Sequence, residues 1–210
     1  MSVADLLALN VAPPCATLMF GAPKCNKTLL AVQTGIAVAS GHPLCDYYRV
    51  IEPGAVLLVE QNDPAGAASL KTILRTFCRT CGRYTALSGP QIPFSFGLQL
   101  IEWLEEQILT RGLRLVILDS YTALRGSRGS GVDIVKAEQQ DLLVLDALAK
   151  RTRCAILIIH HSAKGAAGLD WSNQFVSRLP SGCSVRTGCS TETPPARKWS
   201  RGCSASASRG

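Results

Sequence analysis

The residue types best suited to chemistry come early in the chain, in a segment that combines glycine, lysine and threonine. Gly21 begins it and Lys27 with Thr28 ends it, between the apolar run 16–20 and the helix-like run 29–40. A strand that feeds a tight turn and then a helix leaves backbone N–H groups pointing at one spot, where the helix dipole also favours an anion. The lysine of such a loop reaches the outer phosphates of a nucleotide, and the threonine hydroxyl ligates magnesium. We therefore predict a phosphate-binding loop made of Gly21, Ala22, Pro23, Lys24, Cys25, Asn26, Lys27 and Thr28.

One position departs from the usual pattern of these loops, which is G-x-x-x-x-G-K-[ST]. Asn26 stands where the second glycine is expected. Asparagine enters left-handed backbone conformations at low cost, so the turn stays possible, although its Cβ occupies space where backbone normally approaches phosphate. The segment could also be a strand-to-helix turn that binds no nucleotide, so the prediction depends on the rest of the chain.

Three further apolar runs end in residues that carry charge or protons. These residues are Glu60 after the run 55–59, Asp119 after the run 113–118, and His160 with His161 after the run 154–159. A hydrophobic strand followed by an acid is the Walker B arrangement, in which Asp119 would hold a magnesium-bound water beside the nucleotide. Each residue also has a structural interpretation. Glu60 could solvate a strand end, Asp119 could cap the next turn, and one histidine ring could be a satisfied polar group of the core.

The spacing of apolar residues predicts the scaffold that brings these strand ends together. Continuous apolar runs are typical of parallel strands covered on both faces, and four such runs are present. Helical spacing connects them over residues 29–40, 65–79, 98–108 and 134–150. Open α/β sheets bind ligands at the carboxyl ends of their strands, where the phosphate loop, the two acids and the histidine pair fall. The predicted fold class is therefore α/β, a mainly parallel sheet flanked by helices.

Two segments read as connections between these elements. Residues 82–96 are rich in turn formers, and residues 121–132 contain three glycines together with Arg125 and Arg128. The second segment is typical of a mobile loop that could face a polyanion, although both arginines are expected to be solvated.

Composition narrows the class of protein. The 210 residues, with 47% hydrophobic and 18% charged, suit one globular domain with a sizeable core. Most of the net charge of +7 lies in the last 36 residues, which carry six Lys/Arg and one acid, so it is poor evidence that the core binds DNA. No apolar run approaches the length of a membrane span, and a soluble, cytoplasmic protein without membrane contact is expected. The nine cysteines show no framework spacing and are expected to be reduced thiols.

The chain changes character after about residue 174. Residues 175–210 hold eight Ser, five Arg, four Gly, three Pro and three Cys, without hydrophobic periodicity. We predict a core over residues 1–174 and a low-complexity basic tail over 175–210, which is either disordered or the product of out-of-frame translation. In the second case the core is truncated after its fourth strand and is incomplete at its C-terminal end.

From about Thr17 to Gln174 the chain resembles the RecA-like ATPases close to the RepA-type hexameric replicative helicases of plasmids and phages, which are AAA-family ATPases. The likeness is carried by the segments GAPKCNKTLLAVQTGIAVASG, GAVLLVEQNDPAGAA, LVILDSYTALRGSRG and ILIIHHSAKGAAGLDW. Members of this family sometimes replace the second loop glycine. The resemblance implies a RecA-like P-loop fold with ATP and Mg²⁺ as ligands.

The resemblance also implies roles for single residues. Lys27 and Thr28 would bind phosphate and magnesium, and Asp119 would be the Walker B acid. Glu60 would be the general base that orients the attacking water, and His160 or His161 the sensor of the γ-phosphate, with His160 preferred because it comes directly off the strand. Lys164 matches the basic residue beyond the sensor, and is a candidate for completing a neighbouring subunit's site.

Two functions follow from these expectations. The first is a Mg²⁺-dependent ATPase whose hydrolysis drives movement on, or remodelling of, nucleic acid, with single-stranded DNA as the expected partner and a hexamer as the expected assembly. The second is a nucleotide-binding module without turnover, which would result if the altered C-terminal part prevented ring assembly.

Overall fold

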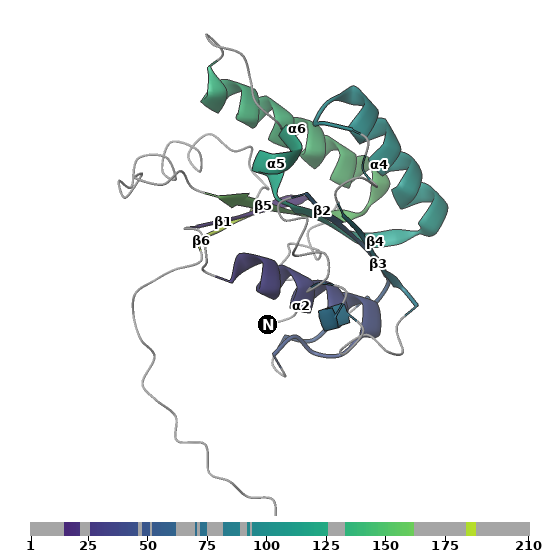
Figure 1. Cartoon of the computed structure of the whole chain (residues 1–210). Coiled ribbons are helices and arrows are strands. Elements are labelled where there is room, and N and C mark those ends of the chain that lie inside the picture. Colours follow the sequence, from purple (N-terminus) through teal and green to yellow (C-terminus); the bar gives the residue numbers. More distant parts are fainter. Residues whose placement is uncertain are drawn as a thin grey trace, which may run out of the picture.

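The computed structural model of the chain shows one sheet between two layers of helices (Figure 1). It describes residues 15–21, 26–45, 48–50, 52–61, 70, 72–74, 82–88, 92, 94–125, 133–161 and 184–187, and the structural statements below concern these residues. Their elements, in chain order, are β1 (Ala16–Gly21), α2 (Lys27–Ser40), β2 (Ala55–Glu60), β3 (Tyr84–Ser88), α4 (Leu98–Arg111), β4 (Leu113–Asp119), α5 (Tyr121–Arg125), α6 (Ile134–Thr152), β5 (Ala155–His161) and β6 (Ser184–Thr187).

The strands described form a single sheet in the order β3-β2-β4-β5-β1-β6, and each neighbouring pair is parallel. All carboxyl ends therefore lie along one edge of the sheet. The four predicted strands, β1, β2, β4 and β5, occupy its centre, as near-continuous apolar runs should, because both faces of a central parallel strand are covered. The predicted α/β fold class is confirmed.

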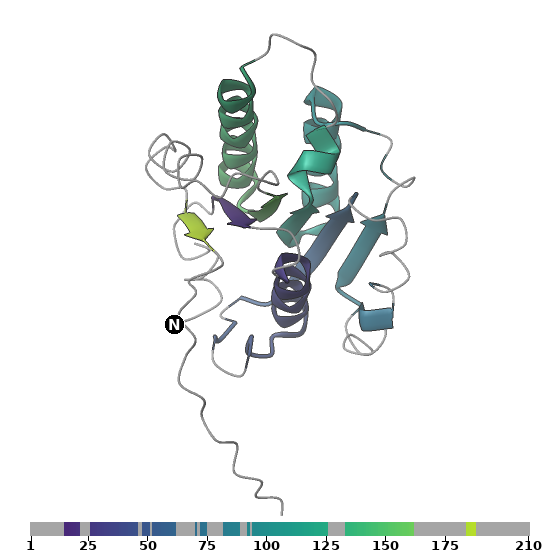
Figure 2. The ribbon, with the colours of Figure 1, turned by 60° about the vertical axis from the view of Figure 1, so that its left-hand side comes forward.

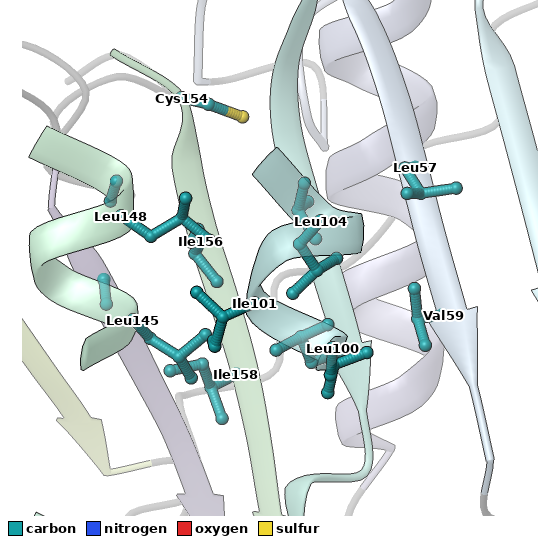
Figure 3. Packing of buried hydrophobic residues seen from close by; sticks show 14 of the residues in the cluster. Leu57, Val59, Leu100, Ile101, Leu104, Leu145, Leu148, Cys154, Ile156 and Ile158 are labelled. Atoms are coloured by element: carbon teal, nitrogen blue, oxygen red, sulfur yellow. The ribbon is translucent and has the colours of Figure 1, made fainter. Parts of the chain in front are cut away.

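Helices cover both faces of the sheet. In Figures 1 and 2, α2 lies on one face, and α4 and α6 lie on the other. Figure 3 shows how α4 and α6 pack over the sheet. The side chains that interdigitate there are Leu100, Ile101 and Leu104 of α4, Leu145 and Leu148 of α6, Ile156 and Ile158 of β5, and Leu57 and Val59 of β2. Burying one such side chain stabilises the fold by about 1.5–3 kcal/mol, so this layer fixes α4 and α6 on the sheet.

A buried carboxylate fixes α6 to the start of the first strand. The backbone N–H of Ala16 donates to Asp146 Oδ1 at 3.2 Å, and Lys150 Nζ lies 2.6 Å from Asp146 Oδ2. Because Asp146 is buried, these two partners offset the cost of removing its charge from water. None of the described helices has the length and apolar character required to cross a membrane.

Three segments differ from the sequence-based expectation. The predicted connection 82–96 contains β3, a half-buried strand at the edge of the sheet. The predicted loop 121–132 begins with the short helix α5, and its remainder lies outside the described residues. Within the predicted tail, residues 184–187 form β6 beside β1, a strand that was not predicted from the sequence. The described helical residues of the predicted helix 65–79 are 70 and 72–74.

Candidate functional site

The predicted phosphate loop lies between the carboxyl end of β1 and the amino end of α2. Asn26 has a left-handed backbone conformation (φ 59°, ψ 25°) and forms the N-cap of α2. This is the geometry for which the pattern normally uses glycine, and asparagine tolerates it because its side chain is short and polar. Gly21 ends β1, whereas Ala22, Pro23, Lys24 and Cys25 lie outside the described residues.

Lys27 closes this loop from the helix side. It is the first residue of α2, is only 5% exposed, and donates from Nζ to the backbone carbonyl of Gly21 at 2.9 Å. The ammonium group is thus held at the end of β1, beside the N-terminus of α2, where an anion is favoured. Thr28 follows in the first turn and is exposed, so its hydroxyl is open to a ligand.

Glu60 and Asp119 form a pair of buried acids on neighbouring strands. They are the last residues of β2 and β4 and occupy the same register position in the parallel ladder. Their exposed fractions are 5% and 1%. Side chains of a strand alternate between its faces, and the alternate residues of these strands, such as Leu58 and Ile117, pack in the α2 layer. Both carboxylates therefore project on the face that carries α2 and Lys27.

The other strand ends lie at the same level of the sheet. Ile159 of β5 is in register with Asp119, and the next two residues of β5, His160 and His161, are in register with Phe20 and Gly21. The four strands that the sequence singled out therefore end within two residues of one another along one edge. Lys164 lies outside the described residues, and so does the side chain of His161.

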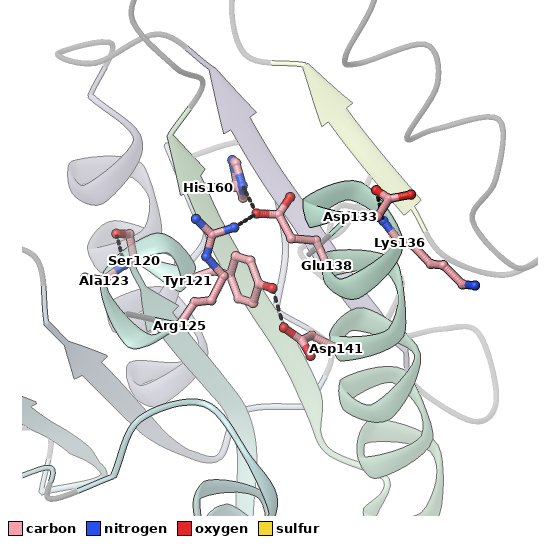
Figure 4. Close-up of polar contacts among 9 residues, drawn as sticks. All are labelled: Ser120, Tyr121, Ala123, Arg125, Asp133, Lys136, Glu138, Asp141 and His160. Carbon is pink, nitrogen blue, oxygen red and sulfur yellow. Dashed lines mark hydrogen bonds and ion pairs between the residues drawn. The ribbon is translucent and has the colours of Figure 1, made fainter. Parts of the chain in front are cut away.

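His160 projects on the opposite face from Glu60 and Asp119. Its strand neighbour Ile158 packs in the layer of α4 and α6, and its ring stacks on Tyr121 of α5 with centroids 5.7 Å apart. Its Nε2 lies 3.7 Å from Oε1 of Glu138, a residue of α6. Figure 4 shows that this oxygen also contacts Arg125. The sequence predicted that His160 follows the strand directly. In the structure β5 extends to His161, so His160 lies within the strand.

Glu138 and its pairing with Arg125 were not foreseen. Arg125 Nη1 donates to Glu138 Oε1, so this arginine is paired in the interior, contrary to the expectation that it is solvated. The signal was present in the sequence: residue 138 precedes Leu142 by one turn and Leu145 by two, on the inward stripe of α6. A glutamate at such a position needs a buried partner.

The donor set fits a nucleotide with magnesium. Mg²⁺ is usually bound through one or two carboxylates together with substrate phosphates and water, and not by a complete protein cage. Asp119 and Thr28 supply such oxygens, while Lys27 and the start of α2 suit phosphate. No group of three or more metal-binding side chains occurs in the described part of the chain.

Comparison with known proteins decides the family. A family model described as an AAA domain matches residues 13–167, which is well over half of the chain. The chain belongs to the AAA domain family. The matched range contains the phosphate loop, both acids and the histidine pair.

Solved structures agree with this assignment at the level of the fold. This AAA domain matches 284 chains of solved structures. One is the crystal structure of the RadB recombinase, with a TM-score of 0.50 and 20% sequence identity over 81% of this chain and 76% of that one. The AAA domain therefore shares the fold of that recombinase, and the predicted RecA-like fold is confirmed. A search of curated protein sequences gave no significant match.

Proposed function

We propose that this AAA domain is a Mg²⁺-dependent ATPase that couples hydrolysis to movement on, or remodelling of, nucleic acid, in the manner of the RepA-type helicases. The observation that carries the proposal is the register pair of Glu60 and Asp119, buried on the same face as Lys27. A general base, a metal-binding acid and a phosphate-binding cation are the three groups that phosphoryl transfer to water requires.

Each residue has a distinct task in this proposal. Glu60 orients the attacking water and accepts its proton, and burial keeps competing water away from the carboxylate. Lys27 exchanges its hydrogen bond with the Gly21 carbonyl for the outer phosphates. Asp119 and Thr28 hold the magnesium ion, which when bound offsets the charge on the phosphates.

The histidine pair is the proposed sensor at the end of β5. The side chain of His160 lies on the face opposite to the acids, where it touches Tyr121, and His161 is in register with Gly21. Separate variants His160→Asn and His161→Asn assign the role. The variant of the sensor residue loses hydrolysis while keeping nucleotide affinity.

The proposed function also includes assembly with other subunits. The RepA-type helicases that the sequence resembles are hexameric, so we propose a homo-oligomer in which Lys164 contributes to the site of a neighbouring subunit. Sedimentation velocity with and without ATP tests this assembly. A strictly monomeric protein that still hydrolyses ATP at full rate would contradict it.

The central experiment is ATP hydrolysis by the full chain with and without single-stranded DNA. We expect DNA to stimulate hydrolysis, and Lys27→Ala to abolish it by removing the cation at the phosphates. Lys136→Ala is the matched control because Lys136 is exposed and belongs to α6, which lies on the opposite face of the sheet from α2. Hydrolysis that persists in Lys27→Ala would show that the activity does not belong to this site.

A nucleotide-binding module without turnover is the second candidate. It is favoured by the position of His160, whose side chain does not share a face with Glu60 and Asp119. Equilibrium binding of a fluorescent ATP analogue separates the two functions. Binding that requires Lys27, without hydrolysis under any DNA condition, selects the binding module.

A further inference from the structure

A buried ion-pair cluster joins three elements on the face of the sheet opposite to α2. Its centre is Glu138 of α6, which is 2% exposed. One oxygen of this carboxylate, Oε1, accepts a hydrogen bond from Arg125 Nη1 of α5 and lies 3.7 Å from His160 Nε2 of β5 (Figure 4). Tyr121 extends the cluster, because its ring stacks on His160 and its hydroxyl donates to Asp141 Oδ2 at 2.5 Å.

The energetics of burial make Glu138 sensitive to both partners. A carboxylate removed from water is costly unless a cation or several donors compensate it. Arg125 supplies the charge, and the shared oxygen ties the position of the guanidinium to that of the imidazole. A displacement of Arg125 therefore changes the contact available to His160, and the reverse is also true.

The two partners of Glu138 lie next to the ends of the two central strands. Arg125 ends α5, which begins two residues after Asp119. His160 precedes His161, which is in register with Gly21, the acceptor of the Lys27 hydrogen bond. The cluster thus lies beside the ends of β4 and β5 on the face that carries α4 and α6, while the proposed nucleotide site lies on the α2 face.

We propose that Glu138 is a positioning residue for the reaction at this site. By holding Arg125 and His160 on one carboxylate oxygen, it fixes the end of β5 relative to the end of β4 and keeps the two sides of the site in one geometry. This inference depends on the proposed ATPase function, and one of its tests does not require turnover.

The first test reads the cluster directly, in the full chain without nucleotide. The protein has three histidines, so the ring ¹H–¹³C signal of His160 can be assigned by its loss in His160→Asn. Glu138→Gln and Arg125→Gln should each move this signal and leave that of His42 in place. The matched control is Asp146→Asn, which alters another buried carboxylate of α6, paired with Lys150 near the start of β1. A His160 signal that ignores Glu138→Gln, or that moves equally in Asp146→Asn, overturns the proposal.

The second test reads the reaction. Glu138→Gln should lower kcat about 10-fold with KM for ATP changed less than about 3-fold, because a misplacement of reacting groups affects the chemical step more than binding. Asp146→Asn should keep kcat per folded molecule, and Glu138→Asp, which retains the charge, should recover part of the lost rate.

The double variant Glu138→Gln with Arg125→Gln guards against simple unfolding. It removes both charges together, so it leaves no unpaired buried charge and should fold. We expect it to regain thermal stability without regaining kcat. Wild-type kcat in this variant would overturn the positioning role. Absence of hydrolysis in the wild-type chain would instead contradict the proposed function, and the histidine signals would still report on the cluster.

Discussion

Glu60 and Asp119 stand side by side at the carboxyl ends of β2 and β4, in register and buried on the same face of the sheet. Neighbouring strands are about 4.8 Å apart, so two carboxylates at these positions repel each other when both are charged, in a region shielded from water. A cation beside them relieves this repulsion. In the proposed function, the magnesium ion of the nucleotide is the cation that fills this role.

Replacing Glu60 tests its role as the base. Glu60→Gln keeps the shape of the side chain but cannot accept a proton, so we expect kcat to fall by about 10²–10⁴-fold, with ATP affinity unchanged. Single-turnover hydrolysis and fluorescent nucleotide binding measure the two quantities. Glu52→Gln is the control, because Glu52 is a surface residue paired with Arg114. A kcat close to wild type in Glu60→Gln would remove Glu60 from the mechanism.

The metal requirement should depend on Asp119. Asp119→Asn removes one negative oxygen ligand and leaves the packing at the end of β4 nearly unchanged. We expect the Mg²⁺ concentration at half-maximal hydrolysis to rise roughly 10-fold or more, by analogy with the loss of other metal-site partners. A magnesium titration at saturating ATP measures it. An unchanged titration midpoint would show that the metal is held elsewhere.

Gly35 should resist substitution because of the packing between α2 and β3. A Cβ built on Gly35 lies 2.6 Å from a ring carbon of Tyr84 and 3.0 Å from Ile117 Cδ1. Such overpacking costs about 1–3 kcal/mol, which exceeds the gain of about 1 kcal/mol from replacing a helical glycine by alanine. Gly35→Ala should thus lower the free energy of unfolding in urea by about 1 kcal/mol. Gly82→Ala, with no heavy atom near its Cβ, should have no comparable effect.

The surface pair between α4 and α6 should give a pH-dependent contribution to stability. Arg151 Nε and Nη2 donate to the two carboxylate oxygens of Glu105, both at 2.6 Å, and these hydrogen bonds hold the pKa of Glu105 below its usual 4.5. Stability from a lowered carboxylate pKa is present above 4.5 and is lost as the pH falls through the lower, folded value.

Because both side chains are partly exposed, Glu105→Gln should cost only about 0.5 kcal/mol at neutral pH. Chemical denaturation across the pH range measures this difference. It should shrink as the medium becomes more acidic. A difference that grows with acidity would contradict the assignment.

Cysteine labelling should distinguish the described thiols. Burial raises the pKa of Cys154 to about 12, while Arg114 and the backbone of Val116 oppose the shift. At pH 8 its thiolate fraction is then roughly one in ten thousand, so it should stay unlabelled by N-ethylmaleimide in the native protein. Cys45 is exposed and should label quickly. Peptide mapping by mass spectrometry reads each site, and equal labelling of the two would show that the β5 end of the core is open.

Apolar runs predicted the central strands well because a parallel strand covered on both faces has little choice of composition. The edge strands β3 and β6 do not follow this pattern. Tyr84–Ser88 is half-buried and flanked by turn formers, and Ser184–Thr187 lies in a segment dominated by small and polar residues. Short edge strands acquire their pairing from the neighbouring strand, which local sequence does not reveal.

For the same reason, the sequence did not show which face of the sheet each strand side chain occupies. When every residue of a run is apolar, alternation gives no indication of which side meets which helix, so the sequence could not tell that His160 faces α5 and α6. The order of the strand ends was predictable from spacing. The contact between His160 and Glu138 was not predictable in the same way. The sequence shows that Glu138 lies on the inward side of its helix, but it does not show which strand residue the glutamate meets.

Helix α6 has two buried carboxylates that contact the sheet. Asp146 binds it to the first residue of β1, and Glu138, two turns away, binds it to the last residues of β5. At 1.5 Å per residue these anchors are about 12 Å apart. The orientation of α6 on the sheet is therefore set by one polar contact at the start of β1 and another at the end of its neighbour β5, in addition to the apolar contacts between them.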